Sequence, residues 1–169
     1  MSPARRDLLV LVALSLALYA PFLGGYWLTD DFVHVERLER ATFAAAFTTP
    51  DAFGFYRPIS RTSLFLDLKL FGEIPWIFRL NNLVLHLAVV CAAWYVATML
   101  IGPGRAAFLA TLAFVLTPKA HPVAVLWPSA RAELLMALFS LLPWRPGSAG
   151  TPMVTVDGWR QPARPMRSA

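Results

Sequence analysis

The sequence predicts an all-α membrane protein: a polytopic bundle of about four transmembrane helices, with amphipathic interfacial helices in its first outer loop. Three observations predict this class. Of the 169 residues, 57% are hydrophobic and only 15% are charged. The apolar residues gather in long runs, and arginines flank these runs. Because a soluble domain of this length could not bury so much apolar surface, a soluble binding module is excluded.

The charge distribution argues against a nucleic-acid partner. The formal net charge is +5, which in a soluble chain would suggest DNA or RNA binding. Here the arginines sit at the ends of apolar runs or crowd the C-terminus, where they act as topology signals. The sequence also lacks zinc-type cysteine spacing, an RNA-binding aromatic signature and a phosphate-binding glycine loop. Cys91 is the single cysteine, so no intramolecular disulfide can form.

The first apolar run extends from Leu8 to Leu23 and follows Arg5 and Arg6. Such a run is typical of either a signal peptide or a first transmembrane helix. Cleavage after Ala20 is disfavoured because Pro21 would follow the cut. We interpret the run as an uncleaved first span with its N-terminus in the cytoplasm.

The loop from Thr29 to Pro75 shows two amphipathic patterns. Apolar residues recur at helical spacing from Phe32 to Phe47, which predicts one helix lying on the membrane surface. A second helix is predicted over Tyr56–Phe71 and is closed by Gly72. The loop lacks the excess of basic residues typical of a cytoplasmic loop, so we expect it to face outward.

The second span is predicted from Ile77 to Ile101 and carries polar side chains in its outer half. Arg79, Asn82 and His86 are spaced i, i+3 and i+7, so they share one helical face. Polar groups within a span face protein or water rather than lipid. For His86 we prefer a structural hydrogen bond between helices to a catalytic role.

Two shorter runs, 106–116 and 132–142, predict a third and a fourth span. The turn between them holds Lys119 and His121 and would face outward. Both termini would then be cytoplasmic. A single span from Ala106 to Trp127 is the alternative interpretation.

Composition changes abruptly after Leu142. Residues 1–142 form the predicted membrane domain, whereas residues 143–169 are rich in Pro, Arg, Gly and Ser and predict a disordered tail. Two origins of this segment stay open: a native cytoplasmic tail, or sequence from a truncation or frameshift that replaces the rest of a longer protein.

Two adjacent carboxylates, Asp30 and Asp31, directly follow the first span. One interpretation is that they cap the helix that begins there. The other is that acids kept near hydrocarbon serve binding or chemistry. The pair alone does not decide between these two interpretations.

Four pieces of sequence, taken in order, carry a family resemblance. They are Asp30-Asp31; Tyr56-Arg57-Pro58 with Ser63-Leu64-Phe65-Leu66-Asp67 and Leu70-Phe71-Gly72; Phe78-Arg79-Leu80-Asn81-Asn82-Leu83-Val84-Leu85-His86; and His121-Pro122 with Trp127, Ser129, Arg131, Glu133, Leu134 and Leu135. Together they resemble the integral-membrane glycosyltransferases of the C superfamily, and the chain is similar to the bacterial relatives of the tetratricopeptide O-mannosyltransferases. The resemblance covers roughly residues 8–142.

The resemblance implies transfer of a sugar from a polyprenyl-phosphate carrier to an unidentified acceptor on the outer face of the membrane. It implies that Asp30 or Asp31 is the catalytic base or helps to bind a divalent cation. Such a base would take the proton of an attacking hydroxyl, and cations would stabilise the departing lipid phosphate. The outer-side candidates for phosphate are Arg57, Arg61, Lys119, His121 and Arg131. For each of these five residues, lipid headgroup contacts or loop salt bridges are the alternative.

Two departures from the family pattern weaken this assignment. Many relatives carry a glutamate directly after the His-Pro pair, where this sequence has Val123. The superfamily also has many more spans, and no membrane-like run follows Leu142. A non-catalytic membrane scaffold or assembly subunit is therefore the rival function.

Overall fold

The computed structural model describes residues 2–117 and 121–142, and every regular element in these ranges is helical. The all-α class predicted from the sequence is confirmed for this part of the chain. The elements are α1 (Pro3–Tyr19), η1 (Ala20–Phe22), α2 (Asp31–Glu39), α3 (Phe43–Thr48), α4 (Pro58–Phe71), α5 (Pro75–Ile101), α6 (Arg105–Val115), α7 (His121–Leu126), η2 (Pro128–Ala130) and α8 (Arg131–Leu141).

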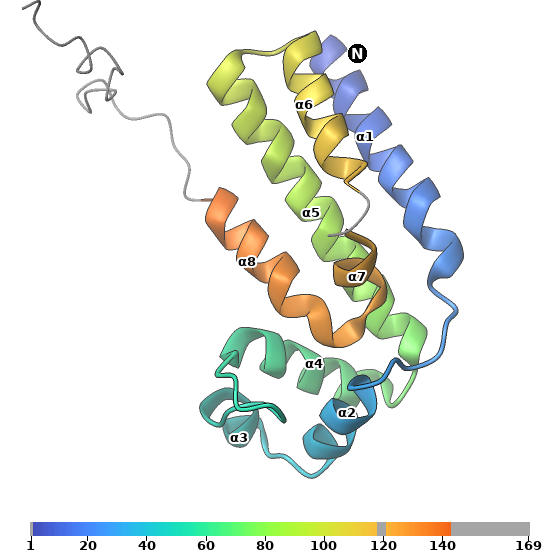
Figure 1. Ribbon diagram of the computed structural model, residues 1–169, viewed down its shortest axis with the longest axis vertical. Helices are drawn as coiled ribbons and strands as arrows, with labels where there is room; N and C mark the ends of the chain where they lie inside the picture. The colour runs from blue at the N-terminus through green and yellow to red at the C-terminus, as the bar shows by residue number, and fades with distance from the viewer. Residues whose placement is uncertain (1, 118–120, 143–169) are drawn as a thin grey trace, which may run out of the picture.

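The central element is α5, which contacts α1, α6, α7 and α8 along its length (Figure 1). Its 27 residues correspond to about 40 Å at 1.5 Å per residue. Pro75 stands at its first turn, where a missing N–H costs nothing, and Gly102 at φ 80° ends it. The helix predicted from Ile77 to Ile101 is confirmed as α5, and it is long and apolar enough to cross a membrane.

Helix length does not confirm the prediction of about four spans. Among the described residues, α5 is the one helix long and apolar enough to cross a membrane. By comparison α1 has 17 residues, and α6 and α8 have 11 each. Pro128, within η2, separates α7 from α8 because its ring cannot continue a helix.

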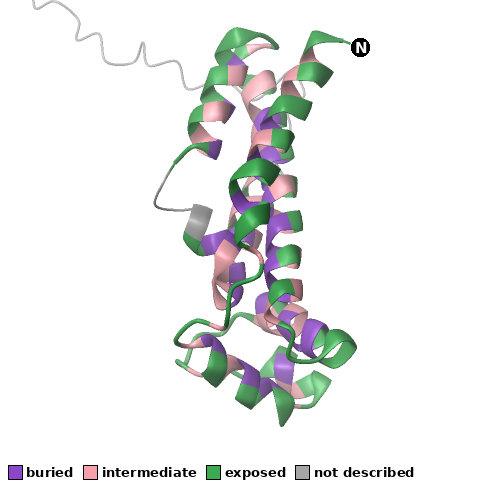
Figure 2. Ribbon diagram, turned by 90° about the vertical axis from the view of Figure 1, so that its right-hand side faces the viewer, coloured by how far each residue is buried: buried purple, intermediate pink, exposed green. Residues whose placement is uncertain are grey.

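The bundle core lies where α1, α5 and α6 meet. It contains Leu11, Val90, Trp94, Ala107 and Val115, all buried. Figure 2 shows that the buried residues lie along the inner sides of the helices, while exposed residues cover the outer sides. Those outer sides carry many large apolar side chains, including Leu9, Val84 and Leu109. A surface of this kind suits lipid better than water.

Helices α2, α3 and α4 form a cap at one end of the bundle, opposite the N-terminus of α1 (Figure 1). The core of the cap is built from one side of each helix: Val35, Leu38, Ala46, Leu64, Phe65 and Leu68, with Phe78 from α5. The amphipathic spacing seen in the sequence therefore produces a small hydrophobic core. The predicted second helix of this loop is confirmed as α4, which Gly72 closes at φ 72°.

The single helix predicted over Phe32–Phe47 is wrong, because the structure divides it into α2 and α3. Thr42 causes the division. It adopts an extended conformation, and its side-chain oxygen accepts a hydrogen bond from the backbone N–H of Ala45 at 3.1 Å. This is a helix N-cap, so a new helix starts at Phe43 with its own direction.

Candidate active site

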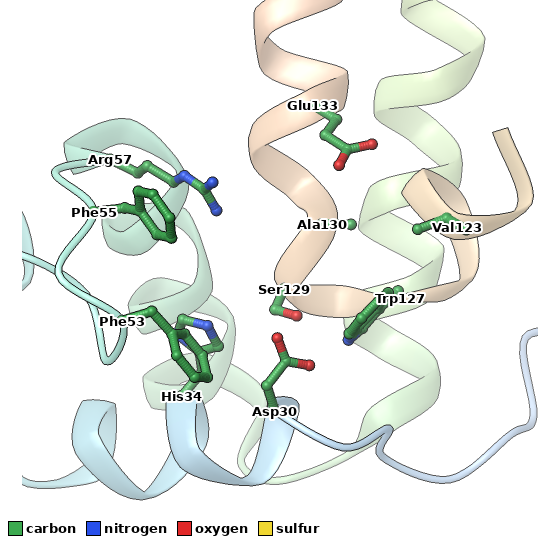
Figure 3. Close-up of a pocket in the computed structure, with 10 residues that line it drawn as sticks. All are labelled: Asp30, His34, Phe53, Phe55, Arg57, Val123, Trp127, Ser129, Ala130 and Glu133. Carbon is green, nitrogen blue, oxygen red and sulfur yellow. The ribbon is translucent and has the colours of Figure 1, made fainter. Parts of the chain in front are cut away.

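A pocket of about 260 Å³ lies between the cap and the start of α8 (Figure 3). It combines charged groups, one indole and two phenyl rings, contributed by four separate parts of the chain. The lining residues are Asp30, His34, Phe53, Phe55, Arg57, Val123, Trp127, Ser129, Ala130 and Glu133. Carboxylates beside aromatic rings are suited to binding a polar molecule with apolar faces.

Asp30 stands at the N-cap position of α2 but makes no side-chain capping bond. Its carboxylate points into the pocket, towards Ser129 and Trp127 (Figure 3). Its Oδ1 atom is buried and has no hydrogen-bond partner among the described residues. Because an unpaired buried carboxylate oxygen costs free energy, this atom is poised to accept a proton or a hydrogen bond from a ligand.

Asp31 has a different environment from its neighbour. It is only 1% exposed, and both of its oxygens are occupied. Oδ2 accepts from the backbone N–H of Leu28 at 3.0 Å, and Oδ1 accepts from that of Ser129 at 3.0 Å. Burial raises the pKa of Asp31, and these two hydrogen bonds partly offset the rise. The carboxylate therefore ties the loop before α2 to η2, behind the pocket.

His34 and its aromatic neighbours form the wall opposite α8. The imidazole packs edge-on against Phe53, with ring centroids 5.5 Å apart. Burial lowers the pKa of His34, although the nearby acids Asp51, Asp30 and Asp31 oppose the change. The ring is therefore favoured in its neutral form at neutral pH.

Asp51 shapes the loop that brings Phe53 and Phe55 to the pocket. Its Oδ1 accepts hydrogen bonds from the backbone N–H groups of both residues, each at 2.9 Å. Arg57 lies over the ring of Phe55, 4.6 Å from its centroid, a cation–π contact that holds the guanidinium at the pocket edge. Arg57 remains exposed, so its charge is accessible to a ligand.

Arg61, also a predicted phosphate contact, lies away from the pocket. Its guanidinium donates to the backbone oxygen of Thr49 at 2.6 Å, to the hydroxyl of Thr49 and to the backbone oxygen of Pro50. The side chain thus closes the turn after α3. The structure places Arg57, but not Arg61, at the pocket.

Arg131 is fully buried beneath the pocket, with no exposed surface. Its Nη1 forms an ion pair with Asp67 at 2.6 Å and donates to the Ser63 hydroxyl at 2.7 Å. Its Nε donates to Asn82 at 2.7 Å, and Nη2 donates to the Phe78 carbonyl at 3.1 Å. A guanidinium engaged in this way joins α8 to α4 and α5. It does not line the pocket where a phosphate would bind.

The three polar residues predicted to share one face of α5, Arg79, Asn82 and His86, are all buried. Arg79 donates to the Leu126 carbonyl at 2.8 Å and to the backbone oxygens of Gly25 and Tyr26. Asn82 donates to the carbonyls of Ala124 and Trp127, each at 3.1 Å. These bonds fix the loop that leads to Asp30 and the end of α7.

His86 is fully buried. It packs edge-on against Tyr19 of α1, with ring centroids 5.1 Å apart. The structure therefore places it inside the bundle, remote from the residues that line the pocket.

Two predicted phosphate contacts cannot be placed. Lys119 lies outside the described residues. His121 begins α7, but its side chain also lies outside the described part of the structure. The lining of the pocket is therefore given for the described residues alone.

The acids of the pocket do not fit a divalent cation. No cluster of three or more His, Cys, Asp or Glu side chains suited to a metal occurs within the described residues. Asp31, the second predicted ligand, already accepts two backbone hydrogen bonds. Since Mg²⁺ and Ca²⁺ need several oxygen ligands around one point, the described acids of the pocket do not form a site for either ion.

A second hollow of about 360 Å³ adjoins the pocket and runs between the start of α4 and α8. Most of its lining is apolar, and Arg57 belongs to both hollows. Its residues are Arg57, Pro58, Ile59, Ser60, Ala132, Leu135, Met136, Phe139 and Ser140. The Arg57 side chain therefore lies where the pocket of charged and aromatic residues meets an apolar groove.

Sequence reasoning missed His34, Phe53 and Phe55 as pocket residues. For His34 a signal existed: it lies four residues after Asp30, one helical turn along the same face. Its backbone N–H donates to the Asp30 carbonyl at 3.0 Å. No helical or strand pattern marks the two phenylalanines, because the turn organised by Asp51 places them.

Comparison with known proteins finds distant relatives and no close one. No protein-family model matches the chain, and no solved structure matches it. A Caenorhabditis elegans protein O-mannosyl-transferase is 26% identical over 152 residues, covering 80% of this chain and 22% of the relative. A human protein O-mannosyl-transferase is 36% identical over 87 residues, covering 52% of this chain and 10% of the relative.

The chain thus spans 22% and 10% of the lengths of these two curated relatives. The match to the worm protein is long enough to include both the cap and the bundle. The chain therefore has weak, partial homology to O-mannosyltransferase-like proteins.

Proposed function

We propose that the chain forms the donor and acceptor site of a membrane glycosyltransferase of the C superfamily, related to bacterial O-mannosyltransferase-like proteins. The enzyme transfers a sugar, mannose by analogy with the relatives' names, from a polyprenyl-phosphate carrier to a hydroxyl group. The observation that carries the proposal is the buried, unpartnered Oδ1 of Asp30, which faces a pocket with aromatic walls and an accessible arginine.

The proposed reaction assigns one role to each side of the pocket. Asp30 accepts the proton of the acceptor hydroxyl while the hydroxyl oxygen bonds to the anomeric carbon of the sugar. The bond between that carbon and the carrier phosphate breaks, and its electron pair leaves with the phosphate. Arg57 stabilises the negative charge of the phosphate. Asp31 and Arg131 do not touch the substrate in this scheme; they hold Asp30 and α8 in place.

The apolar groove supports a lipid-linked donor. With Arg57 at the junction, a phosphate on the guanidinium would place its sugar in the pocket and its isoprenoid tail between α4 and α8. The groove residues Leu135, Met136 and Phe139 supply apolar contact for such a tail. A water-soluble nucleotide sugar would make no use of this groove.

We also propose that the bundle crosses the membrane about four times, with both termini in the cytoplasm and the cap outside. The chain direction supports this topology: α1 runs towards the cap, α5 runs away from it, and α6 returns along α5 (Figure 1). Arg5, Arg6 and Arg105 then lie at the end opposite the cap. Exposed apolar side chains along the bundle support the same placement.

Asp30 provides the sharpest test of the chemistry. In the membrane enzyme, Asp30→Asn is expected to abolish release of lipid phosphate from polyprenyl-phosphate mannose, because the amide cannot accept the proton. Membrane insertion and Arg57-dependent binding of the carrier should be unchanged. Full activity of Asp30→Asn would overturn the assignment. Carrier binding combined with no turnover in any variant would favour the scaffold alternative.

The donor site is tested separately on the 169-residue chain. Polyprenyl monophosphate is added to the protein in detergent, and the bound fraction is read by native mass spectrometry. Arg57→Gln is expected to weaken binding about tenfold, the scale of a charge-assisted contact. Arg61→Gln is the matched control, because that guanidinium is occupied by the loop. Equal losses in both variants would contradict the donor site.

A further inference from the structure

The indole of Trp127 offers the pocket a hydrogen-bond donor that the scheme above does not use. Its Nε1 atom is buried and has no hydrogen-bond partner among the described residues. The nitrogen lies on the side of the ring that faces Asp30 (Figure 3). The pocket therefore contains a buried donor and a buried acceptor, both without partners, that do not bond to each other.

Trp127 is held in position by its backbone rather than by its indole. Its N–H donates to the Val123 carbonyl at 3.0 Å, and its carbonyl accepts from Asn82 at 3.1 Å and from Ala130 at 3.0 Å. On the other side, Asp31 fixes Ser129 through the backbone N–H of that residue. The backbone at Trp127 is thus fixed, whereas its buried indole N–H remains without a partner among the described residues, which is unfavourable for a buried donor.

One kind of group satisfies both atoms at once. An alcohol hydroxyl accepts a hydrogen bond at its oxygen and donates one through its hydrogen. An ammonium group offers no acceptor to the indole, and a carboxylate would be repelled by Asp30. A metal ion bound to Asp30 Oδ1 would meet the positive end of the N–H dipole. The chemistry of the pair therefore selects a neutral hydroxyl.

We propose that Trp127 donates its indole N–H to the same hydroxyl oxygen whose proton Asp30 accepts. This inference rests on the proposed function and adds a residue to its acceptor site. As the proton moves to Asp30, negative charge grows on the hydroxyl oxygen. The hydrogen bond from the indole N–H stabilises this charge. The indole itself keeps its proton throughout.

The experiment observes the indole N–H directly. The 169-residue chain, labelled with ¹⁵N-tryptophan, is placed in lipid nanodiscs, and the signals of its six tryptophans are recorded. Trp127→Phe identifies the Trp127 signal by its loss. The probe is N-acetyl-threonine methylamide, and its matched control is the valine analogue, which replaces the hydroxyl by a methyl group. Methyl α-mannoside is a third ligand that carries hydroxyls on a sugar.

A hydroxyl probe is expected to shift the Trp127 signal, whereas the valine analogue leaves it unchanged. A response to the threonine probe assigns the site to a protein side chain, and a response to the mannoside alone assigns it to a sugar. In Trp127→Phe the affinity for the active probe should fall roughly fivefold, the scale of one hydrogen bond. Trp76→Phe, an exposed tryptophan outside the pocket, should leave that affinity unchanged.

Two results would overturn the inference. One is an equal shift with the threonine and valine probes. The other is unchanged probe affinity in Trp127→Phe while the remaining indole signals report an intact fold. Neither result depends on catalysis. A protein whose turnover requires Asp30 but whose Trp127 signal ignores every hydroxyl would retain the proposed function and lose this inference.

Discussion

Two sets of polar side chains in this protein differ in how far their hydrogen bonds are satisfied. The first, the buried clamp, consists of Arg131, Asp67, Asn82 and Ser63, where each side chain is bonded to another. The second, the pocket set, consists of Asp30, His34, Arg57 and Trp127, where Asp30 and Trp127 keep buried atoms without partners. A satisfied network stabilises one arrangement, whereas an unsatisfied one has capacity left for a ligand.

This difference shows how to assign roles to charged residues for which the sequence predicts the same role. Arg57 and Arg131 are both arginines predicted at the outer side, and both border the start of α8. One is exposed over an aromatic ring, and the other is completely buried in an ion pair. Removing a member of the clamp should therefore affect stability, and removing a member of the pocket set should affect binding.

The largest expected effect is on the clamp arginine. Arg131→Met should destabilise the protein by about 3–5 kcal/mol, because Asp67 is left as a buried charge without its partner. Thermal unfolding in detergent, followed by circular dichroism, measures the loss. Arg57→Met is the matched control and should change stability by no more than about 0.5 kcal/mol. Similar losses in the two variants would remove the distinction between clamp and pocket set.

Asn82 should rank second. Asn82→Leu preserves the size of the side chain but leaves the Arg131 Nε and the Ala124 carbonyl without the Asn82 partner, and removes one of the two hydrogen bonds to the Trp127 carbonyl. We expect a loss of about 2 kcal/mol in the same assay, within the range for buried unsatisfied groups. Asn81→Leu removes one partly buried bond to Asp67 and should cost less. The reverse order would contradict the central place of Asn82.

Asp31 should show a smaller effect on stability. In Asp31→Asn the new amide group cannot accept from one of the two N–H groups, on Leu28 or on Ser129. Because burial already raises the pKa of this carboxyl, loss of the charge returns part of the cost, and we expect a net loss of about 1 kcal/mol. Asp30→Asn should be neutral in the same measurement. A larger loss for Asp30 would place it in the clamp.

The smallest effect concerns pH. Burial lowers the pKa of folded His34 below the ordinary value of about 6.5. The unfolded chain therefore binds a proton first as pH falls, so the contribution of His34 to stability is complete above about pH 6.5 and declines below it. Unfolding at about pH 7.5 and about pH 5.5 should show a steeper decline in the native protein than in His34→Gln. Identical pH dependence would exclude this titration.

Helix-forming patterns gave most of the fold. The uninterrupted apolar run of α5 and the Pro58 and Gly72 boundaries of α4 specify those helices locally, so the sequence was sufficient to predict them. The shared face of Arg79, Asn82 and His86 followed from spacing alone, and all three side chains are buried. The break at Thr42 was missed because its capping hydrogen bond competes with a continuous amphipathic pattern.

The site was harder to predict because its contacts are distant in sequence. The sequence marks Asp30 and Asp31 only as a pair. Their environments differ because the backbone N–H of Ser129, 98 positions along the chain from Asp31, donates to the Asp31 carboxylate. In the same way, the sequence could not tell Arg57 from Arg131, because burial of Arg131 depends on Asp67 and Ser63 in another helix. Tertiary partners, rather than residue type, decide which charge is available.

The bond between Asp31 and Ser129 also sets an order of events during synthesis. Asp31 leaves the ribosome 98 residues before its partner, an interval of about 5–20 s at 5–20 residues per second. During that time the loop before α2 lacks its hydrogen bond to η2. The ion pair between Asp67 and Arg131 has not formed either. The apolar core of the cap must therefore hold α2 and α4 together on its own. The loop that carries Asp30 and Asp31 can take up its final position only when the start of α8 has been synthesised, so translation pauses before Arg131 would prolong the time for which this loop lacks its link to η2.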